Sequence, residues 1–130
     1  MSEFLILFSA SLLAVAPPVF HAQGEMAGEV TQTSVILQSR LTSATQLTAG
    51  DVPGMPGVAQ FELSESKDFS PSHRTDWLKA EADNDFILKV KVAGLKSATR
   101  YYYRLIYGVD QDSVQTGEAC SFRTLQGSDG

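Results

Sequence analysis

The sequence predicts an all-β domain, an antiparallel β-sandwich of about seven short strands preceded by a signal peptide. Three observations support this. Apolar and polar residues alternate with a period of two over most of the chain after residue 24. Segments rich in Gly, Pro, Asp and Ser separate the alternating stretches at short intervals. No window of about a dozen residues after residue 24 carries the 3.6-residue periodicity of a helix.

The N-terminus differs from the rest of the chain. The stretch from Phe4 to Phe20, FLILFSASLLAVAPPVF, carries no charge, and the Pro-Pro pair within it would break a helix. Small residues at Ala22 and Gly24 fit a cleavage site, so residues 1-24 are expected to be a secretory signal peptide. A lipid-inserted anchor and a buried segment of the domain are the alternatives. With a signal, the chain is secreted or periplasmic and has no membrane attachment after cleavage.

The first two expected strands lie on either side of a long loop. Residues 33-41, TSVILQSRL, are rich in β-branched side chains, which favour a strand. Residues 42-56 contain Thr, Gly and Pro and are expected to form the loop. Residues 57-63, GVAQFEL, alternate, so this strand should bury one face and expose Gln60 and Glu62 on the other. The inward positions are Ala59, Phe61 and Leu63.

The second half of the chain continues the pattern. The further segments expected to be strands are 76-81, 86-92, 100-107 and 119-124. The expected connections are residues 64-72 with Phe69 tucked underneath, a turn at 83-85, and a hairpin connection at 108-117. The sandwich is expected over residues 25-126, with a disordered tail at 127-130. Strand alternation predicts a core of Val35, Leu37, Phe61, Leu63, Leu88, Val90, Tyr101, Tyr103, Leu105 and Phe122.

The stretch GLKSATRYYYRL, from Gly94 to Leu105, contains three consecutive tyrosines. Leu95 and Tyr101 stand where a tyrosine corner belongs in immunoglobulin-like and fibronectin type III-like sandwiches, with the Tyr hydroxyl bonded to backbone a few residues upstream. The alternation then points Tyr101 inward. It points Tyr102 and Arg104 outward, which makes these two the candidates for a surface contact.

The composition excludes several classes of function. The net charge is -5, so the domain would repel a nucleic-acid backbone. A single cysteine, Cys120, excludes an intrachain disulfide and a zinc site built from several cysteines. It lies on the apolar side of a strand, where a buried and inert thiol is expected. No catalytic, cofactor-binding or metal-binding residue is expected in this chain.

Other polar residues have ordinary explanations. His21 lies in or beside the signal, and His73 stands alone in a polar loop. Asp110 and Asp112 resemble part of a calcium loop but lack its Gly and distal Glu, so a solvated hairpin is favoured. Five basic residues gather around the last strands, where they would draw a phosphorylated substrate, face an acidic neighbouring domain or form a solvated sheet face. They are Lys89, Lys91, Lys96, Arg100 and Arg104.

The order of several blocks resembles a known family. GEVTQTSVILQSRL, GVAQFELSESKDF, VKVAGLKSATRYYYRL and SFRT are similar in order and spacing to the N-terminal fibronectin type III-like domain of PhoD-like alkaline phosphatases, over residues 26-124. Purple acid phosphatases carry a related domain. The resemblance implies a noncatalytic accessory domain of a secreted, metal-dependent alkaline phosphatase or phosphodiesterase.

The resemblance also implies a partner. Catalysis, with its calcium and iron, would lie in a separate metallophosphatase domain, supplied in cis or by a split gene. Whether the chain has any enzymatic role of its own stays open. The alternative is a standalone secreted β-sandwich that binds protein or carbohydrate, which would need an exposed aromatic surface such as Tyr102.

Overall fold

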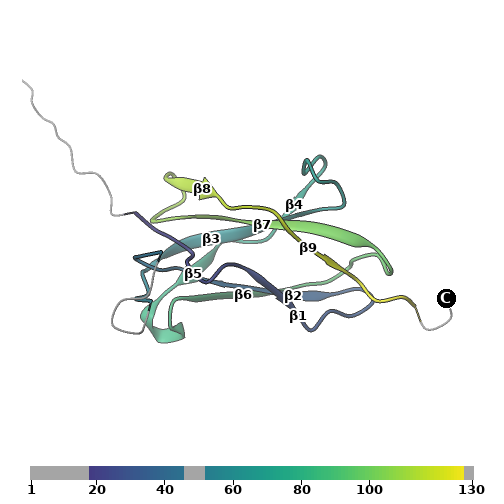
Figure 1. Cartoon of the computed structure of the whole chain (residues 1–130), viewed down its shortest axis with the longest axis horizontal. Coiled ribbons are helices and arrows are strands. Elements are labelled where there is room, and N and C mark those ends of the chain that lie inside the picture. The colour runs from purple at the N-terminus through teal and green to yellow at the C-terminus, as the bar shows by residue number, and fades with distance from the viewer. Residues whose placement is uncertain (1–17, 46–51, 128–130) are drawn as a thin grey trace, which may run out of the picture.

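The computed structural model describes residues 18–45 and 52–127. These residues form nine β-strands and one short 3-10 helix, arranged as two stacked sheets (Figure 1). The strands are β1 (Met26–Gly28), β2 (Val35–Arg40), β3 (Gly57–Ser64), β4 (His73–Arg74), β5 (Leu78–Ala80), β6 (Ile87–Val92), β7 (Arg100–Gly108), β8 (Val114–Thr116) and β9 (Cys120–Arg123). The 3-10 helix, η1, spans Ala82–Asn84.

The smaller sheet has the order β1-β2-β6, and both pairings are antiparallel. In the register of β2 and β6, Leu37 lies opposite Val90 and Ser39 lies opposite Leu88. The exposed side chains of Lys89 and Lys91 lie on β6, an edge strand of this sheet. Charged lysines on an edge strand discourage pairing with another chain.

The larger sheet is built around β3 and β7, which pair antiparallel from Val58 opposite Gly108 to Ser64 opposite Tyr102. Strands β4 and β5 both pair with β3, and β8 and β9 both pair with β7. Strands β8 and β9 together act as one edge strand interrupted at residues 117-119, where Gly117 N still donates to Leu105 O at 2.7 Å.

The core lies between the two sheets and contains the side chains that strand alternation predicts, except that Val90 is only partly buried. Leu37, Phe61 and Leu105 are fully buried, and each such side chain stabilises the fold by about 1.5–3 kcal/mol. The rings of Tyr101 and Phe122 stack with their centroids 5.6 Å apart. Phe69 is buried under its loop, as predicted.

The structure corrects four details of the sequence prediction. Both faces of β3 are covered, so Gln60 and Glu62 are buried, because the chain after β3 folds over its outer face. The hairpin connection at 108-117 contains β8. Trp77 lies just before β5 rather than in a strand. The short strand β1 has too little alternation to be predicted from sequence.

No helix among the described residues is long and apolar enough to cross a membrane.

Candidate functional site

The described residues contain no group of three His, Cys, Asp or Glu side chains that could hold a metal ion. The notable arrangements therefore lie elsewhere: at the two ends of strand β7, on the outer face of the larger sheet, and in a polar groove beside β2.

The start of β7 forms the first arrangement, which we call the tyrosine-corner end. Tyr101 is buried, and its hydroxyl accepts a hydrogen bond from Lys96 N at 2.9 Å. Leu95 packs against the core. Gly94 precedes it with φ +75°, a backbone conformation that side chains disfavour. Thr124 closes the corner, since its Oγ1 donates to Lys96 O at 2.6 Å.

A groove of about 640 Å³ opens at the tyrosine-corner end. Its apolar residues include Leu63, Val92, Leu95, Pro71 and Tyr101, and its polar residues include Ser64, Ser72 and His73. Glu65, another lining residue, forms an ion pair with Lys96, with Oε2 and Nζ 3.1 Å apart. The chain leaves the sandwich at this same end. There Leu125 N donates a backbone hydrogen bond to Thr31 O at 3.0 Å, and Leu125 itself is 55% exposed.

Arg104 lies on the outer face of the larger sheet but is engaged within the molecule. Its Nε lies 2.7 Å from Glu62 Oε1, and its guanidinium carbon lies 3.9 Å from the centre of the Phe69 ring. Ser72 donates to the second carboxylate oxygen of Glu62 at 2.6 Å. Burial alone would raise the pKa of Glu62, but the hydrogen bonds from Ser72 and Arg104 outweigh burial and hold that pKa below its usual value. Arg104 thus fastens the segment after β3 to the sheet.

Tyr102 is half-buried on the same outer face. It lines a shallow cavity of about 420 Å³ together with Lys67, Ala119, Cys120 and Ser121. This is the part of the predicted surface contact that stays accessible to a ligand.

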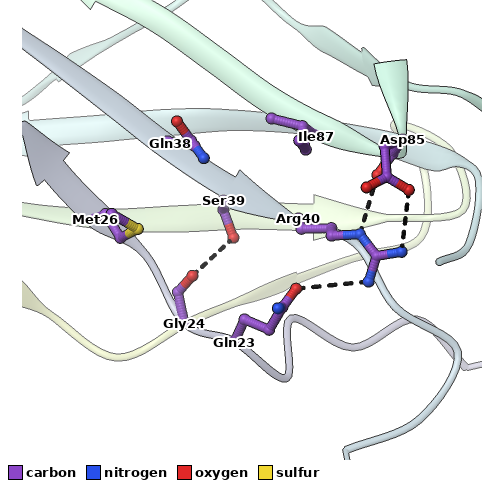
Figure 2. Close-up of a pocket in the computed structure, with 8 residues that line it drawn as sticks. All are labelled: Gln23, Gly24, Met26, Gln38, Ser39, Arg40, Asp85 and Ile87. Carbon is purple, nitrogen blue, oxygen red and sulfur yellow. Dashed lines mark hydrogen bonds and ion pairs between the residues drawn. The ribbon is translucent and has the colours of Figure 1, made fainter. Parts of the chain in front are cut away.

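A polar groove of about 320 Å³ lies beside the end of β2, and Figure 2 shows the residues that line it. Arg40 is its main charged group. Its guanidinium donates to Asp85 O at 3.0 Å, to Val52 O at 2.6 Å and to Gln23 Oε1 at 3.5 Å, and it pairs with the Asp85 carboxylate. The N–H donors of the guanidinium thus find acceptors in three separate segments of the chain, at residues 23, 52 and 85. Arg40 therefore joins loops and is not a free anion-binding cation.

The far end of β7 forms the second notable arrangement, which we call the N-terminal-segment end. His21 Nδ1 bonds the carboxylate of Glu25, and the His21 ring lies 4.5 Å from the Tyr107 ring between centroids. Ser39 Oγ lies 3.2 Å from Glu25 Oε2. The hydrogen bond to Glu25 raises the pKa of His21 despite partial burial, and the Glu118 carboxylate adds to the increase.

Cys120 lies midway along the sheet and is half-buried next to Tyr103. Burial and the nearby Glu25 carboxylate raise the pKa of the Cys120 thiol, although a hydrogen bond from Tyr103 opposes the increase. A raised pKa disfavours the thiolate that a nucleophile requires.

The remaining polar candidates are scattered. Lys89 and Lys91 belong to the smaller sheet, whereas Arg100 and Arg104 belong to the larger one, so the basic residues form no single patch. Asp110 Oδ1 accepts from Asp112 N at 2.9 Å, which is a turn contact. His73 is exposed on β4.

Sequence reasoning missed the N-terminal-segment end. The only local signal is the spacing of His21 and Glu25, four positions apart. Residues 18-24 also fall inside the stretch expected to be a signal peptide; the remainder of that stretch, residues 1-17, lies outside the described residues.

Comparisons with known proteins agree with the fold. The family model described as PhoD-like phosphatase, N-terminal domain, matches residues 13–126. A search of curated proteins found no match. A solved structure of PhoD is similar with a TM-score of 0.67 and 21% identity, covering 90% of this chain and 21% of that chain. The chain thus spans about a fifth of that protein's length.

Two further solved structures are similar over nearly their whole length. The sensor domain of the anti-sigma factor RsgI4 from Pseudobacteroides cellulosolvens has a TM-score of 0.56 at 16% identity, covering 87% of this chain and 99% of that chain. The fibronectin type III domain of human fibronectin type III domain containing protein 3 has a TM-score of 0.57 at 16% identity, covering 93% and 95%. These likenesses confirm the predicted fibronectin type III-like sandwich.

Proposed function

The chain belongs to the family of PhoD-like phosphatase N-terminal domains, and we propose on this premise that it is the noncatalytic accessory domain of an exported, metal-dependent alkaline phosphatase or phosphodiesterase. The observation that carries the proposal is the extent of the matches. The family model covers residues 13–126, whereas the similar PhoD structure is matched over only 21% of its chain. Catalysis would then belong to a metallophosphatase domain, present in cis or encoded by a split gene.

The described residues support a noncatalytic role. Calcium or iron, which the family resemblance implies, would need several clustered carboxylate or imidazole ligands, and the described residues contain no such group. The metal ions would therefore bind in the catalytic domain. The half-buried Cys120, with its raised pKa, is a poor nucleophile.

The tyrosine-corner end is the part of the surface where we expect a catalytic domain to pack. The chain leaves the sandwich there, the Leu125 side chain is exposed, and the apolar groove that contains Leu95 and Tyr101 opens at the same end. Covering an exposed apolar side chain and an apolar groove with a neighbouring domain stabilises the assembly. The accessory domain would buttress the catalytic domain or shape access to its substrate.

A phosphatase assay tests the noncatalytic part of the proposal. The purified chain, supplied in turn with calcium, iron and zinc, is expected to give no turnover of a phosphomonoester or a phosphodiester. Turnover that persists after repurification would contradict it. The coding sequence downstream of Gly130 is expected to specify a metallophosphatase domain, and its absence from the neighbourhood would remove the proposed partner.

Co-expression of the chain with that catalytic domain tests the packing surface. Leu125→Asp should weaken co-purification, because the charge would be buried in the interface. Val114→Asp is the matched control, since Val114 is also an exposed apolar residue, 41% accessible, but lies in β8 near the other end of β7. Equal capture by both variants would place the interface elsewhere.

The second candidate is a standalone secreted module that binds protein or carbohydrate. It is favoured by the accessible Tyr102 beside Lys67. A Tyr ring next to a polar rim suits stacking on a sugar. Pull-down with immobilised glycans or a protein mixture should then lose capture in Tyr102→Ala, and unchanged capture would count against this candidate.

A further inference from the structure

The segment before β1 is integrated into the sandwich. Val19 is 2% exposed and belongs to the hydrophobic core. Phe20 and Thr42 exchange two backbone hydrogen bonds, with Phe20 N to Thr42 O at 2.9 Å and Thr42 N to Phe20 O at 2.8 Å. Gln115 reaches across from β8, where its Nε2 donates to Val19 O at 2.9 Å. The segment thus joins the sandwich through an isolated β-bridge at Phe20 and then turns toward β1, where Gly24 N donates to His21 O at 2.8 Å.

The partner of this segment is itself buried. Thr42 is 0% exposed, and its Oγ1 accepts a hydrogen bond from Ala22 N at 3.2 Å. Thr42 also forms an antiparallel bridge with Gly54, so Phe20, Thr42 and Gly54 lie side by side. Without residues 18-24, the backbone groups of Thr42 that face Phe20 would lose their partners, and buried backbone groups rarely stay unpaired in folded proteins.

Two side chains hold the end of the segment. His21 binds the Glu25 carboxylate and lies against the Tyr107 ring, and Arg40 donates to Gln23. The segment is thus attached to both sheets, through β2 in the smaller sheet and through β7 and β8 in the larger one.

We propose that the exported chain keeps residues 18-24 as part of the folded domain, so that any signal cleavage falls upstream of Pro18 and not at Ala22 to Gly24. The inference rests on the export part of the proposed function. Loss of Val19 would open the core, and loss of Phe20 would unpair Thr42. A cleavage at Ala22 to Gly24 would remove both residues.

The sequence upstream of Pro18 contains the apolar region of a signal peptide. The apolar stretch from Phe4 to Ala16 has 13 residues, within the range of about 7–15 that is typical of the apolar region of a signal peptide. It ends in Ala14-Val15-Ala16, an A-x-A-like triplet that is followed by Pro17. The stretch up to Phe20, by contrast, is longer than that range.

The position of the mature N-terminus tests the proposal directly. The full chain, expressed in a bacterium with its own N-terminus, is collected from the periplasm and from the medium, and its intact mass is measured. We expect a chain that begins at or before Pro18. A folded exported chain that begins anywhere in residues 19-25 would overturn the proposal.

A second measurement tests the segment without depending on export. In the full chain, Val19→Ala should lower the thermal midpoint by roughly 10 °C, because it leaves a cavity in the core. Val114→Ala, a matched change of a 41% exposed valine, should lower it by less than about 2 °C. Equal midpoints for the two variants would overturn the structural half of the proposal.

Hydrogen exchange on the unmodified full chain tests the proposal even if the Val19 variant fails to fold. Peptides containing the Phe20 and Thr42 amides should exchange as slowly as peptides from β2. Fast exchange at Phe20 would contradict the proposal. If no chain leaves the cytoplasm, the export proposal fails, whereas the exchange and midpoint measurements still decide whether the segment belongs to the domain.

Discussion

Each end of strand β7 buries a tyrosine, but the two tyrosines contact different kinds of partner. At the tyrosine-corner end, the Tyr101 hydroxyl accepts a hydrogen bond from the backbone of Lys96, only five positions away. At the N-terminal-segment end, Tyr107 packs against the His21 ring, which comes from the other end of the chain and is paired with Glu25. The hydrogen bond of Tyr101 is local and joins two neutral groups. The N-terminal-segment end is assembled from distant segments and carries ionisable groups.

This difference predicts how the stability of each end responds to substitution and to pH. A local corner closes as soon as its own loop forms, because few residues have to be ordered to make the contact. The distant end requires β2, β7 and β8 to be in place before residues 18-24 can pack. We therefore expect the tyrosine-corner end to respond mainly to loss of packing, and the N-terminal-segment end to respond to pH as well.

The largest effect expected is at the tyrosine-corner end. Tyr101→Ala should lower the free energy of unfolding by about 4 kcal/mol, because it removes a buried ring that stacks on Phe122. Tyr101→Phe keeps the ring and loses only the hydroxyl that Lys96 N binds, so we expect a loss of about 1 kcal/mol. Urea unfolding measures both values. A Tyr101→Phe variant as stable as the unmodified chain would show that the hydrogen bond adds nothing to the corner.

Glycines make the comparison between the ends sharper. Gly94 and Gly24 lie at opposite ends, both have positive φ, +75° and +74°, and neither has an atom within 4 Å of an added Cβ. Replacement by Ala should cost about 1 kcal/mol at each position through backbone strain alone. Gly28→Ala, equally open but with ordinary φ in β1, should be neutral or slightly stabilising. If all three substitutions cost the same in urea unfolding, the positive φ at Gly94 and Gly24 would not be the cause of the loss.

The smallest effect expected is a pH dependence confined to the N-terminal-segment end. Because Glu25 raises the pKa of folded His21 above its ordinary value of 6.5, the folded chain binds this proton more tightly than the unfolded chain does. The resulting stability is fully present below about pH 6.5 and is lost as the pH rises through the folded-state pKa. We expect a loss of less than about 1 kcal/mol, since His21 is partly exposed.

Thermal midpoints at pH 6 and pH 8 check this prediction. The unmodified chain should be less stable at pH 8 by a small margin, and His21→Gln should remove most of the difference. Tyr101→Phe serves as the control and should keep it. A difference that survives in His21→Gln would assign the pH dependence to other groups.

The parts of the fold that could be predicted are those whose partners are close in sequence. Alternation in β2, β3 and β7 identifies their inward faces, because successive side chains of a strand point to opposite sides. The spacing of Leu95 and Tyr101 similarly indicates a corner, since both groups lie on one short connection. Family resemblance then supplied the expectation of a PhoD-like phosphatase N-terminal domain, and the family match over residues 13–126 confirms that family.

The parts that could not be predicted depend on contacts between distant segments. Glu62 alternates as an outward residue, yet it is buried because Arg104, 42 positions away, and the loop after β3 cover it. Gln115 reaches Val19 across 96 positions. In an apolar, uncharged run such as Phe4 to Phe20, hydropathy alone does not separate a signal from a buried segment of the domain, because both are apolar for different reasons.

Strand β7 also acts as a spacer. The first described residues, near Val19, lie at its Gly108 end, and the chain departs near Leu125 at its Arg100 end (Figure 1). A strand of nine residues is roughly 30 Å long at about 3.3 Å per residue. The segments before Pro18 and after Gly127 are therefore attached to the domain at opposite ends of β7. Tension applied between them would load β9, the last strand, along its axis and shear its pairing with β7.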